Sequence, residues 1–527
     1  MRPTFALGLA LGWRRVVAVF VAVVAVLWAG TLWHGPAALP VAATVAVLVV
    51  ALAVLTWRGA PLLRLLGRRR RKPVSTAVDA ADEHQLQWTQ TSAAIRSAGY
   101  DLIAVVAVDG PSHIPSVLDH HRVQSAATLP VSVIAEALRQ FDVALSGIDI
   151  LSVGRRRASK AHHHYAATYS TIVGDHPAMG RRRTWCVLRM NSLDNLAAVA
   201  CRESVAATLV ACAQRLAVEL SARHCAARVV DAAELADVDE LLSAGVGEKV
   251  RPHWGGVSHE RGFATSYWVS PRDISTATLD RLWVPDTEYT ATTIQLRPTP
   301  IGPASVGVLV RYGTGGPLRE PPITGLNPLS GRHDQALRAG LADAPEPPIQ
   351  APHRPLQAGE DLRAPIGASG VIVGATTAGH PLLVDLGAAA PAATATITVA
   401  GELALLVQLA LRAAATGYQV LVVSGRPARW RQATAAGLRV LPELPEQLPD
   451  QGRGVMVVYD RAHGAGPAAA ITMRAVAPGS ASVADVHVEQ DSPRTAVVRT
   501  ADFQYRAHID VSAERNLIGT PPEGRAA

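Results

Sequence analysis

An uncharged apolar block near the start of the sequence constrains the fold more than any other feature. From Val16 to Trp57 the chain contains no Asp, Glu, Lys or Arg. One helical crossing of a bilayer needs about 20 apolar residues, and this block is about twice that long. The triplet His34-Gly35-Pro36 interrupts the block with residues that favour a turn. The block therefore predicts two transmembrane helices over residues 16–57, one at about 16–33 and the other at about 37–57.

Basic residues on both sides of the block predict its orientation. Arg14 and Arg15 lie in the preceding segment 1–15, and Arg68–Lys72 lie in the following segment 58–74. Positively charged flanks stay in the cytoplasm. The sequence therefore predicts a multi-pass protein of the cell (inner) membrane with both termini cytoplasmic. A cleaved signal peptide is the main alternative. A second apolar segment and the absence of a convincing small-residue cleavage site argue against it.

The basic juxtamembrane linker over residues 58–74 has two interpretations. The favoured one is a topology marker that stops transfer of the chain across the membrane. The other is a contact with anionic membrane lipids, worth about 1 kcal/mol for each basic residue near the surface. Nucleic acid is not expected as a partner, because the positive balance is concentrated beside the membrane and no recognition motif accompanies it.

The first region after the linker, residues 75–343, alternates predicted strands and helices. Apolar runs predict strands at 102–109 and 147–153, among others. Helical spacing of apolar residues predicts helices at 131–141 and 197–220. This alternation indicates a cytoplasmic α/β domain.

A proline-rich linker at residues 344–355 is predicted to separate this domain from a second one at residues 356–518. The second region has predicted strands at 370–374, 381–385, 396–400, 419–424 and 454–460, with one helix at 402–416. Its strand–helix–strand order predicts a second α/β domain with a parallel sheet. The tail at 519–527 is expected to be disordered.

The second region contains the outline of a nucleotide site. Thr396–Gly401 is a predicted strand that ends in glycine directly before a helix, a layout that places phosphates on backbone amides. Val455–Asp460 is an apolar strand that ends in a carboxylate, as in a Walker B strand that holds Mg²⁺. Gly379–Asp385 resembles the segment leading to the nucleotide site of FtsK-like motor ATPases. A phosphate loop, however, requires GxxxxGK[ST]. Here the glycine is followed by Glu402, and no lysine follows Lys249. We interpret the region as a degenerate FtsK-like α/β domain without nucleotide chemistry.

Other clusters of reactive side chains have simpler interpretations. The histidines of His120-His121 and His162–His164 would alternate faces on a strand and make poor metal sites. Asp237 and Asp239 imitate a metal-binding DxD motif, but they lie in a polar helical run and predict an exposed helix face. The cysteines include no CxxC pair, so we expect free and mostly buried thiols in a reducing compartment; they are Cys186, Cys201, Cys212 and Cys225.

Arg181–Arg183 leave two interpretations open: a surface for an acidic partner, or an ordinary charged loop. No Gly-x-Ser-x-Gly, HExxH or Cys/His nucleophile pair occurs in the sequence. The sequence therefore assigns no catalytic, cofactor-binding or metal-binding residue, and it predicts no cofactor and no enzyme activity.

Several separate segments closely resemble the EccE family of the mycobacterial type VII (ESX) secretion systems. They include RRRTWCVLRMNSLDNLAAVACRESVAATLVACAQRL (Arg181–Leu216), LPVSVIAEALRQFDVALSGIDILSV (Leu129–Val153), LDRLWVPD (Leu279–Asp286) and GLNPLSGR (Gly325–Arg332). The resemblance extends from the start of the chain to about residue 340, and the second region matches only the longer members of the family.

This resemblance implies a structural, non-catalytic subunit of the secretion membrane complex that supports the assembly or stability of the export machinery. The implied partners are EccB-, EccC- and EccD-like subunits, with an EccC-type ATPase supplying the energy. The alternative is a membrane-anchored enzyme that depends on a nucleotide or sugar nucleotide, or a protein that senses a ligand.

Overall fold

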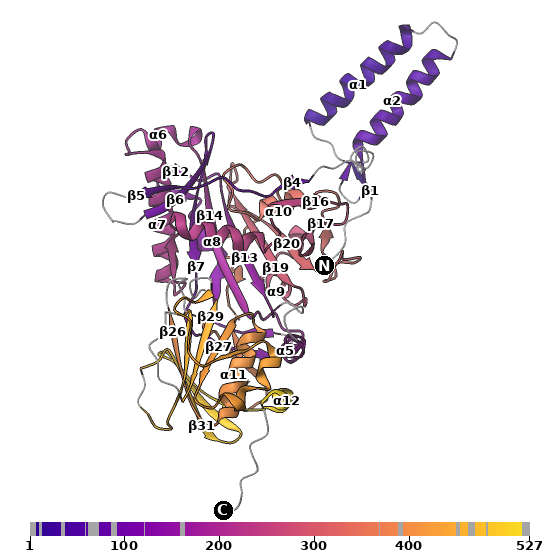
Figure 1. Ribbon diagram of the computed structural model, residues 1–527. Coiled ribbons are helices and arrows are strands. Elements are labelled where there is room, and N and C mark those ends of the chain that lie inside the picture. Colours follow the sequence, from indigo (N-terminus) through magenta and orange to yellow (C-terminus); the bar gives the residue numbers. More distant parts are fainter. Residues whose placement is uncertain are drawn as a thin grey trace, which may run out of the picture.

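Two large β-sheets form the body of the protein, and a pair of apolar helices extends away from it (Figure 1). The computed structural model describes residues 7–9, 13–32, 37–57, 60–61, 73–85, 92–120, 122–158, 164–367, 369–387, 394–449, 454–461, 469–480 and 483–518. Most of the predicted basic linker and the whole predicted tail at 519–527 lie outside these residues, as do His34–Pro36.

The apolar block forms helices α1 (Trp13–Leu32) and α2 (Ala38–Val54), which pack against each other. The second helix ends at Val54, three residues before the predicted end. The residues that follow form strand β2 (Leu55–Trp57), which pairs with β1 (Leu7–Leu9) and β3 (Ala60–Pro61). Backbone pairing with a neighbouring strand thus ends the helix, although residues 55–57 remain uncharged.

Large apolar side chains on these helices face outwards. Phe20 and Trp28 on α1 are 68% and 66% exposed, and Val47 on α2 is 69% exposed. The small residues Ala42 and Ala46 are buried, and their spacing of four places them on one face of α2. By length and composition, the one described helix that could cross a bilayer is α7 in the body, half of which is buried; the apolar stretches of α1 and α2 are shorter.

The first sheet is antiparallel in every described pair. Across the sheet its strands are β4 (Val74–Ser75), β16 (Lys249–Pro252), β17 (Val257–His259), β18 (Gly262–Trp268), β20 (Ser305–Thr314), β19 (Tyr289–Arg297), β13 (Gly147–Arg155), β14 (Arg181–Asn191), β7 (Asp101–Val108), β6 (Ser92–Ala98) and β5 (Asp82–Gln85). Three short strands pair beside this path: β15 (Ala227–Val229) with β7, β21 (Asn327–Pro328) with β18, and β22 (Arg354–Pro355) with β20. The alternation of strands and helices in this region therefore does not build a parallel sheet.

Helices cover both faces of the first sheet, which explains why its central strands read as continuous apolar runs. One face buries Ile148 and Ile150 with α7 (Val205–Ala222), α4 (Val131–Glu136) and α9 (Thr276–Arg281). The other face buries Leu151 and Val153 with α8 (Ala232–Ser243) and α10 (His333–Ala339). The strand positions predicted at 102–109 and 147–153 agree with β7 and β13.

Two predicted helices of this region are shorter than expected. The helix predicted at 197–220 divides into α6 (Leu196–Val199) and α7, and the Ser204 hydroxyl accepts a hydrogen bond from the Ala207 amide at the start of α7. A serine at this position supplies an N-cap, so a new helix begins there. The helix predicted at 131–141 ends at Glu136, because the chain then forms the hairpin of β11 (Arg139–Gln140) and β12 (Val143–Ala144).

The second sheet combines a parallel half and an antiparallel half. Its order is β28 (Arg439–Leu441), β27 (Gln419–Ser424), β29 (Val455–Asp460), β30 (Ile471–Val476), β26 (Ala395–Ala400), β31 (Val486–Ser492), β32 (Thr495–Arg499), β33 (Gln504–His508), β24 (Val371–Ala375), β25 (Pro381–Val384), β8 (Pro115–Asp119) and β9 (Arg122–Gln124). The pairs from β28 to β31 are parallel, as predicted for this region. Helix α11 (Leu403–Ala415) follows β26 and is almost fully buried.

The two sheets share chain segments across the predicted boundary at 344–355. Strands β8 and β9 come from the first region, yet β8 pairs with β25 in the second sheet. Likewise, β10 (Thr128–Pro130) pairs with β23 (Arg363–Pro365). The proline-rich segment lies along the first sheet, where the Gln295 side chain donates to the Ile349 carbonyl and accepts from the Ala351 amide. Helix α5 (Tyr165–Val173), from the first region, packs against α11.

Candidate functional site

The edge of the second sheet where β27 and β29 end contains the carboxylate that the sequence places at a magnesium position. Asp460 is the last residue of β29 and pairs in register with Ser424, the last residue of β27. Parallel neighbours bring their carboxyl ends to the same edge of a sheet, which is where ligands bind in doubly wound folds. The Asp460 side chain is fully buried.

Protein donors occupy both oxygens of this carboxylate. Oδ2 of Asp460 accepts from the Ser424 hydroxyl at 2.7 Å and from Nε1 of Trp430 at 2.8 Å. The Arg426 guanidinium donates to Oδ1 through Nη2 at 2.8 Å and to Oδ2 through Nε at 3.0 Å. Burial opposes ionisation of Asp460, but the hydrogen bonds from Arg426, Trp430 and Ser424 outweigh burial and lower the pKa of this carboxyl. The carboxylate is thus an ionised structural partner of the 3₁₀ turn Pro427–Trp430.

A side chain also occupies the place in front of α11 where a phosphate would have to sit. The Glu402 amide at the start of α11 donates to Oε1 of Gln490 at 2.8 Å, and Gln490 belongs to the neighbouring strand β31. A Cβ atom added at Gly401 would lie 2.7 Å from the same Oε1. The amide that a phosphate loop would turn toward its ligand therefore has a partner within the protein.

The predicted lead-in segment lies at a distance from these residues. Gly379–Asp385 spans the turn after β24 and strand β25, and four strands separate β25 from β26 in the sheet. The structure therefore brings Asp460 and Gly401 to the same parallel half of the sheet, with one strand between β29 and β26, and leaves Gly379–Asp385 in the antiparallel half.

The other sequence candidates have structural partners. Asp239 on α8 forms an ion pair with buried Arg96, whose Nη1 lies 2.9 Å from Oδ1, so half of the DxD pattern serves the packing of α8. All four cysteines are free, and three of them are buried, as predicted. Burial raises the pKa values of Cys186, Cys212 and Cys225, which makes these thiols poor nucleophiles.

The three arginines at 181–183 lie in strand β14, so their interpretation as a charged loop is wrong. Arg182 is buried, stacks on the Trp283 ring at 3.9 Å and donates to the Pro365 carbonyl at 3.0 Å. Arg181 lies over the Tyr418 ring at 4.9 Å. The bond to the Pro365 carbonyl and the contact with the Tyr418 ring join the first sheet to the second region, and the sequence pattern alone did not reveal either of them.

Arg183 pairs with Asp109, one of the residues that line an open cleft of about 430 Å³. The Nη1 atom of Arg183 lies 3.0 Å from Asp109, and Arg228 lies 3.6 Å away on the other oxygen. Pro111, Ser221 and His224 also line the cleft. Burial raises the pKa of Asp109 despite both arginines. The cleft is large enough for a small ligand, but its carboxylate already has two cationic partners.

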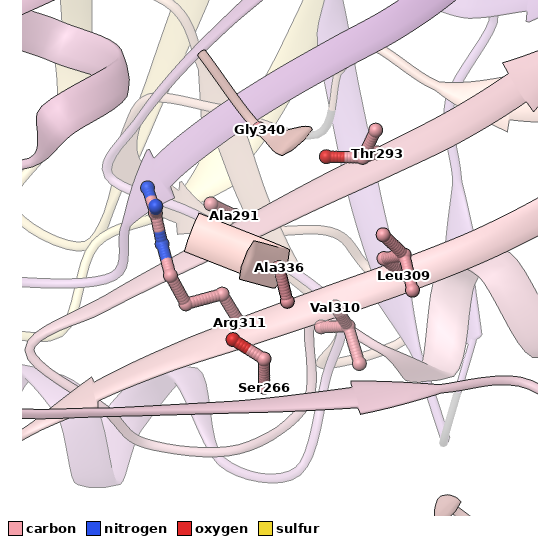
Figure 2. A pocket seen from close by; sticks show the side chains of 8 residues that line it. All are labelled: Ser266, Ala291, Thr293, Leu309, Val310, Arg311, Ala336 and Gly340. Atoms are coloured by element: carbon pink, nitrogen blue, oxygen red, sulfur yellow. The ribbon is translucent and has the colours of Figure 1, made fainter. Parts of the chain in front are cut away.

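A second cavity is too small for any ligand (Figure 2). It measures about 10 Å³ and lies between β18, β19, β20 and α10. Ser266 and Arg311 line it, and the Ser266 hydroxyl and Nε of Arg311 have no hydrogen-bond partner among the described residues. A volume of this size holds about one water molecule.

The two predicted histidine clusters lie in different surroundings in the structure. His164, the last of the triplet, is exposed before α5, and the other two lie outside the described residues, as does His121. His120, by contrast, lies beside Asp119 and His380, and the sequence separates His120 from His380 by 260 positions. No local pattern connects residue 120 with residue 380. The pairing of β8 with β25 brings them together.

Comparison with known proteins gives one consistent result. A family model described as "Putative type VII ESX secretion system translocon, EccE" matches residues 178–269, from the end of the α5–β14 connection to β18. The ESX-5 secretion system protein EccE5 of Mycobacterium marinum is 36% identical over 387 residues, which cover 68% of this chain and 95% of the relative. EccE5 of Mycobacterium tuberculosis is 35% identical over 395 residues, covering 70% and 97%. The ESX-2 protein EccE2 of Mycobacterium tuberculosis is 27% identical over 420 residues, covering 77% and 74%.

Proposed function

The chain belongs to the EccE family and is a component of an ESX type VII secretion system, and we propose that it serves there as a structural, membrane-anchored subunit without catalytic activity. The non-catalytic part of the proposal rests on the hydrogen bonds that the Asp460 carboxylate accepts. A carboxylate that holds Mg²⁺ must offer oxygens to the ion or its waters. Both oxygens of Asp460 accept from Ser424, Arg426 and Trp430 instead.

The second sheet is, in this proposal, an FtsK-like scaffold that has lost nucleotide binding. Its parallel strands follow the spatial order β27-β29-β30-β26-β31. This order places one strand between the phosphate-loop position after β26 and the carboxylate position after β29. Gln490 and the missing Gly-Lys-Ser/Thr supply the reason for the loss.

Helices α1 and α2 are proposed as a transmembrane hairpin with both termini in the cytoplasm. A helix of 20 residues spans about 30 Å, the thickness of the hydrocarbon core. The two threonines of the pair hydrogen-bond within their own helices, Thr31 to the Trp28 carbonyl and Thr44 to the Pro40 carbonyl. In lipid, such polar groups must find their partners internally. Ala42 and Ala46 let the two helices approach closely, as small residues do in membranes.

The proposed partners are EccB-, EccC- and EccD-like subunits, with membrane lipids around the hairpin. The test is to purify the tagged full-length chain from its native membrane in mild detergent, followed by native gel electrophoresis and mass spectrometry. We expect the chain to migrate in a large complex with these three kinds of subunit. Recovery as a lone membrane protein would contradict the proposed role.

A second experiment tests the non-catalytic part. The same purified chain is titrated with a fluorescent ATP analogue and Mg²⁺, with an FtsK-type ATPase as the positive control. We expect no saturable binding to this chain. Saturable binding that unlabelled ATP competes away, and that the substitution Gln490→Ala strengthens, would show an active nucleotide site and contradict the proposal. Topology is tested separately with reporter fusions at the C-terminus and in the 33–36 connection, which we expect to report opposite sides of the membrane.

A further inference from the structure

We propose that Asp119, His120 and His380 form a binding site for one zinc ion at the outer edge of the second sheet. Each side chain offers one ligand atom, and these atoms all lie within 4.8 Å of one another. Oδ1 of Asp119 is the centre of the group: Nδ1 of His120 contacts it directly, and Nε2 of His380 lies 3.5 Å from it. The two imidazole rings are 5.5 Å apart between centroids.

These distances suit a tetrahedral ion. Zinc binds histidine nitrogen and carboxylate oxygen at about 2.0–2.2 Å, so its ligand atoms lie roughly 3.3 Å from one another. The separation of 3.5 Å between Asp119 Oδ1 and His380 Nε2 already matches this value. His120 reaches the same arrangement by moving from direct contact with the carboxylate to a position around the ion. Two imidazoles and one carboxylate favour zinc over magnesium or calcium, which prefer oxygen ligands alone. A water molecule would complete the fourth position.

Neighbouring hydrogen bonds already hold two of the ligands in place. Oδ2 of Asp119 accepts from Nε2 of Gln124 at 3.1 Å, which leaves Oδ1 directed at the two histidines. The turn that carries His380 is closed by bonds to Thr376: the Thr376 amide donates to the His380 carbonyl at 2.7 Å, and the His380 amide donates to the Thr376 hydroxyl at 3.2 Å. Such outer-shell partners orient the ligands of metal sites.

The site would fasten two distant parts of the chain. Asp119 is the last residue of β8, which the first region contributes to the second sheet, and His120 follows it in the turn to β9; His380 precedes β25. Only three residue pairs join β8 to β25. A zinc ion at the end of this short ladder would hold the β8–β9 hairpin against β25. The inference therefore assigns the ion a structural task at the seam between the two regions.

Zinc binding by the full-length chain in detergent tests the proposal. The chain is purified with a tag that contains no histidine, stripped with EDTA, and titrated with ZnCl₂ by calorimetry and with CoCl₂ by visible absorption. The variants are H380Q and D119N. H253Q is the matched control, because His253 is an exposed histidine in the turn between β16 and β17, far from Asp119 in the sequence. Thermal unfolding in EDTA establishes that each variant is folded.

We expect one tight zinc site in the native chain and in H253Q, a four-coordinate Co²⁺ spectrum, and a loss of affinity of at least tenfold in H380Q and in D119N. Zinc should also raise the unfolding temperature of the native chain and of H253Q, and not that of H380Q. Absence of tight binding by the native chain would overturn the proposal. Equal binding by H380Q would overturn it as well, because the zinc would then be held by other histidines.

Discussion

Replacing Asp460 by asparagine tests whether this carboxylate is a structural partner within the protein. Asn keeps the shape of the side chain, but it removes the negative charge and turns an NH₂ group toward donors that need an acceptor. Hydrogen bonds to a charged group contribute about 1.5–3 kcal/mol each, and breaking a buried ion pair costs about 3–5 kcal/mol. The Arg426 side chain is 30% exposed, so water offsets part of this loss. We therefore expect Asp460→Asn to destabilise the parallel half of the second sheet by about 3 kcal/mol.

Hydrogen–deuterium exchange followed by mass spectrometry measures this loss locally, which suits a chain too large to unfold in one step. A loss of 3 kcal/mol speeds exchange of the most protected amides in β27 and β29 by roughly 150-fold, since about 1.4 kcal/mol corresponds to a factor of ten. The matched control is Glu402→Gln, because the Glu402 side chain is exposed and makes no hydrogen bond at the start of α11. It should change exchange in these strands by less than threefold.

The result that would refute this reasoning is an Asp460→Asn variant whose β27 and β29 amides exchange within threefold of the native rate, or more slowly. Carboxylates that serve metal binding often destabilise the folded protein, so their removal is neutral or stabilising. Such an outcome would return Asp460 to the nucleotide hypothesis.

Lowering the pH perturbs the same network. The Asp460 carboxyl has a pKa below the ordinary value of about 3.9. The stabilisation from the ionised form of Asp460 is therefore complete above the ordinary pKa and is lost as the pH falls below it, through the lower folded value. Exchange in β27 and β29, corrected for the intrinsic rate at each pH, should stay constant from pH 7 to about pH 5 and rise only at more acid values.

Two further changes test the interlocked sheets and the helix pair. Deleting Leu356–Ala527 should reduce the amount of folded protein and its resistance to protease, because β8 and Arg182 lose their partners. The control deletion of 519–527 should change neither. Equal protease resistance of the two truncated proteins would contradict the shared seam. Replacing Ala46 by Leu should overpack the contact between α1 and α2 and cost about 1–3 kcal/mol of stability in detergent, which lowers the melting temperature. The control Val47→Leu, at a 69% exposed position, should leave the melting temperature unchanged. Equal melting temperatures of the two variants would show that the helices do not pack through Ala46.

The sequence by itself determined those features that depend on neighbouring residues. The length of the apolar block and its freedom from charge predict helices at its two halves, and the structure has α1 and α2 there. The run of strands and one helix in the second region agrees within one or two residues with β24, β25, β26, α11, β27 and β29. Apolar periodicity and glycine breaks act over a few residues, so they can be read directly. The missing Gly-Lys-Ser/Thr was equally visible, because a phosphate loop is a contiguous motif.

Tertiary structure alone decided which distant segments meet. Nothing near residue 117 indicates that β8 will pair with β25, because strand pairing is a contact between backbones that any apolar edge could make. The same reason applies to the arginines at 181–183, which the sequence interprets as a loop or a docking surface. In the structure Arg182 is buried, because the Pro365 carbonyl and the Trp283 ring lie next to its guanidinium. Asp460 acquired its donors, and His120 its neighbour His380, in this way. Local patterns set the elements, but the partners of these side chains come from distant chain segments, which meet only when the strands pair and the sheets pack.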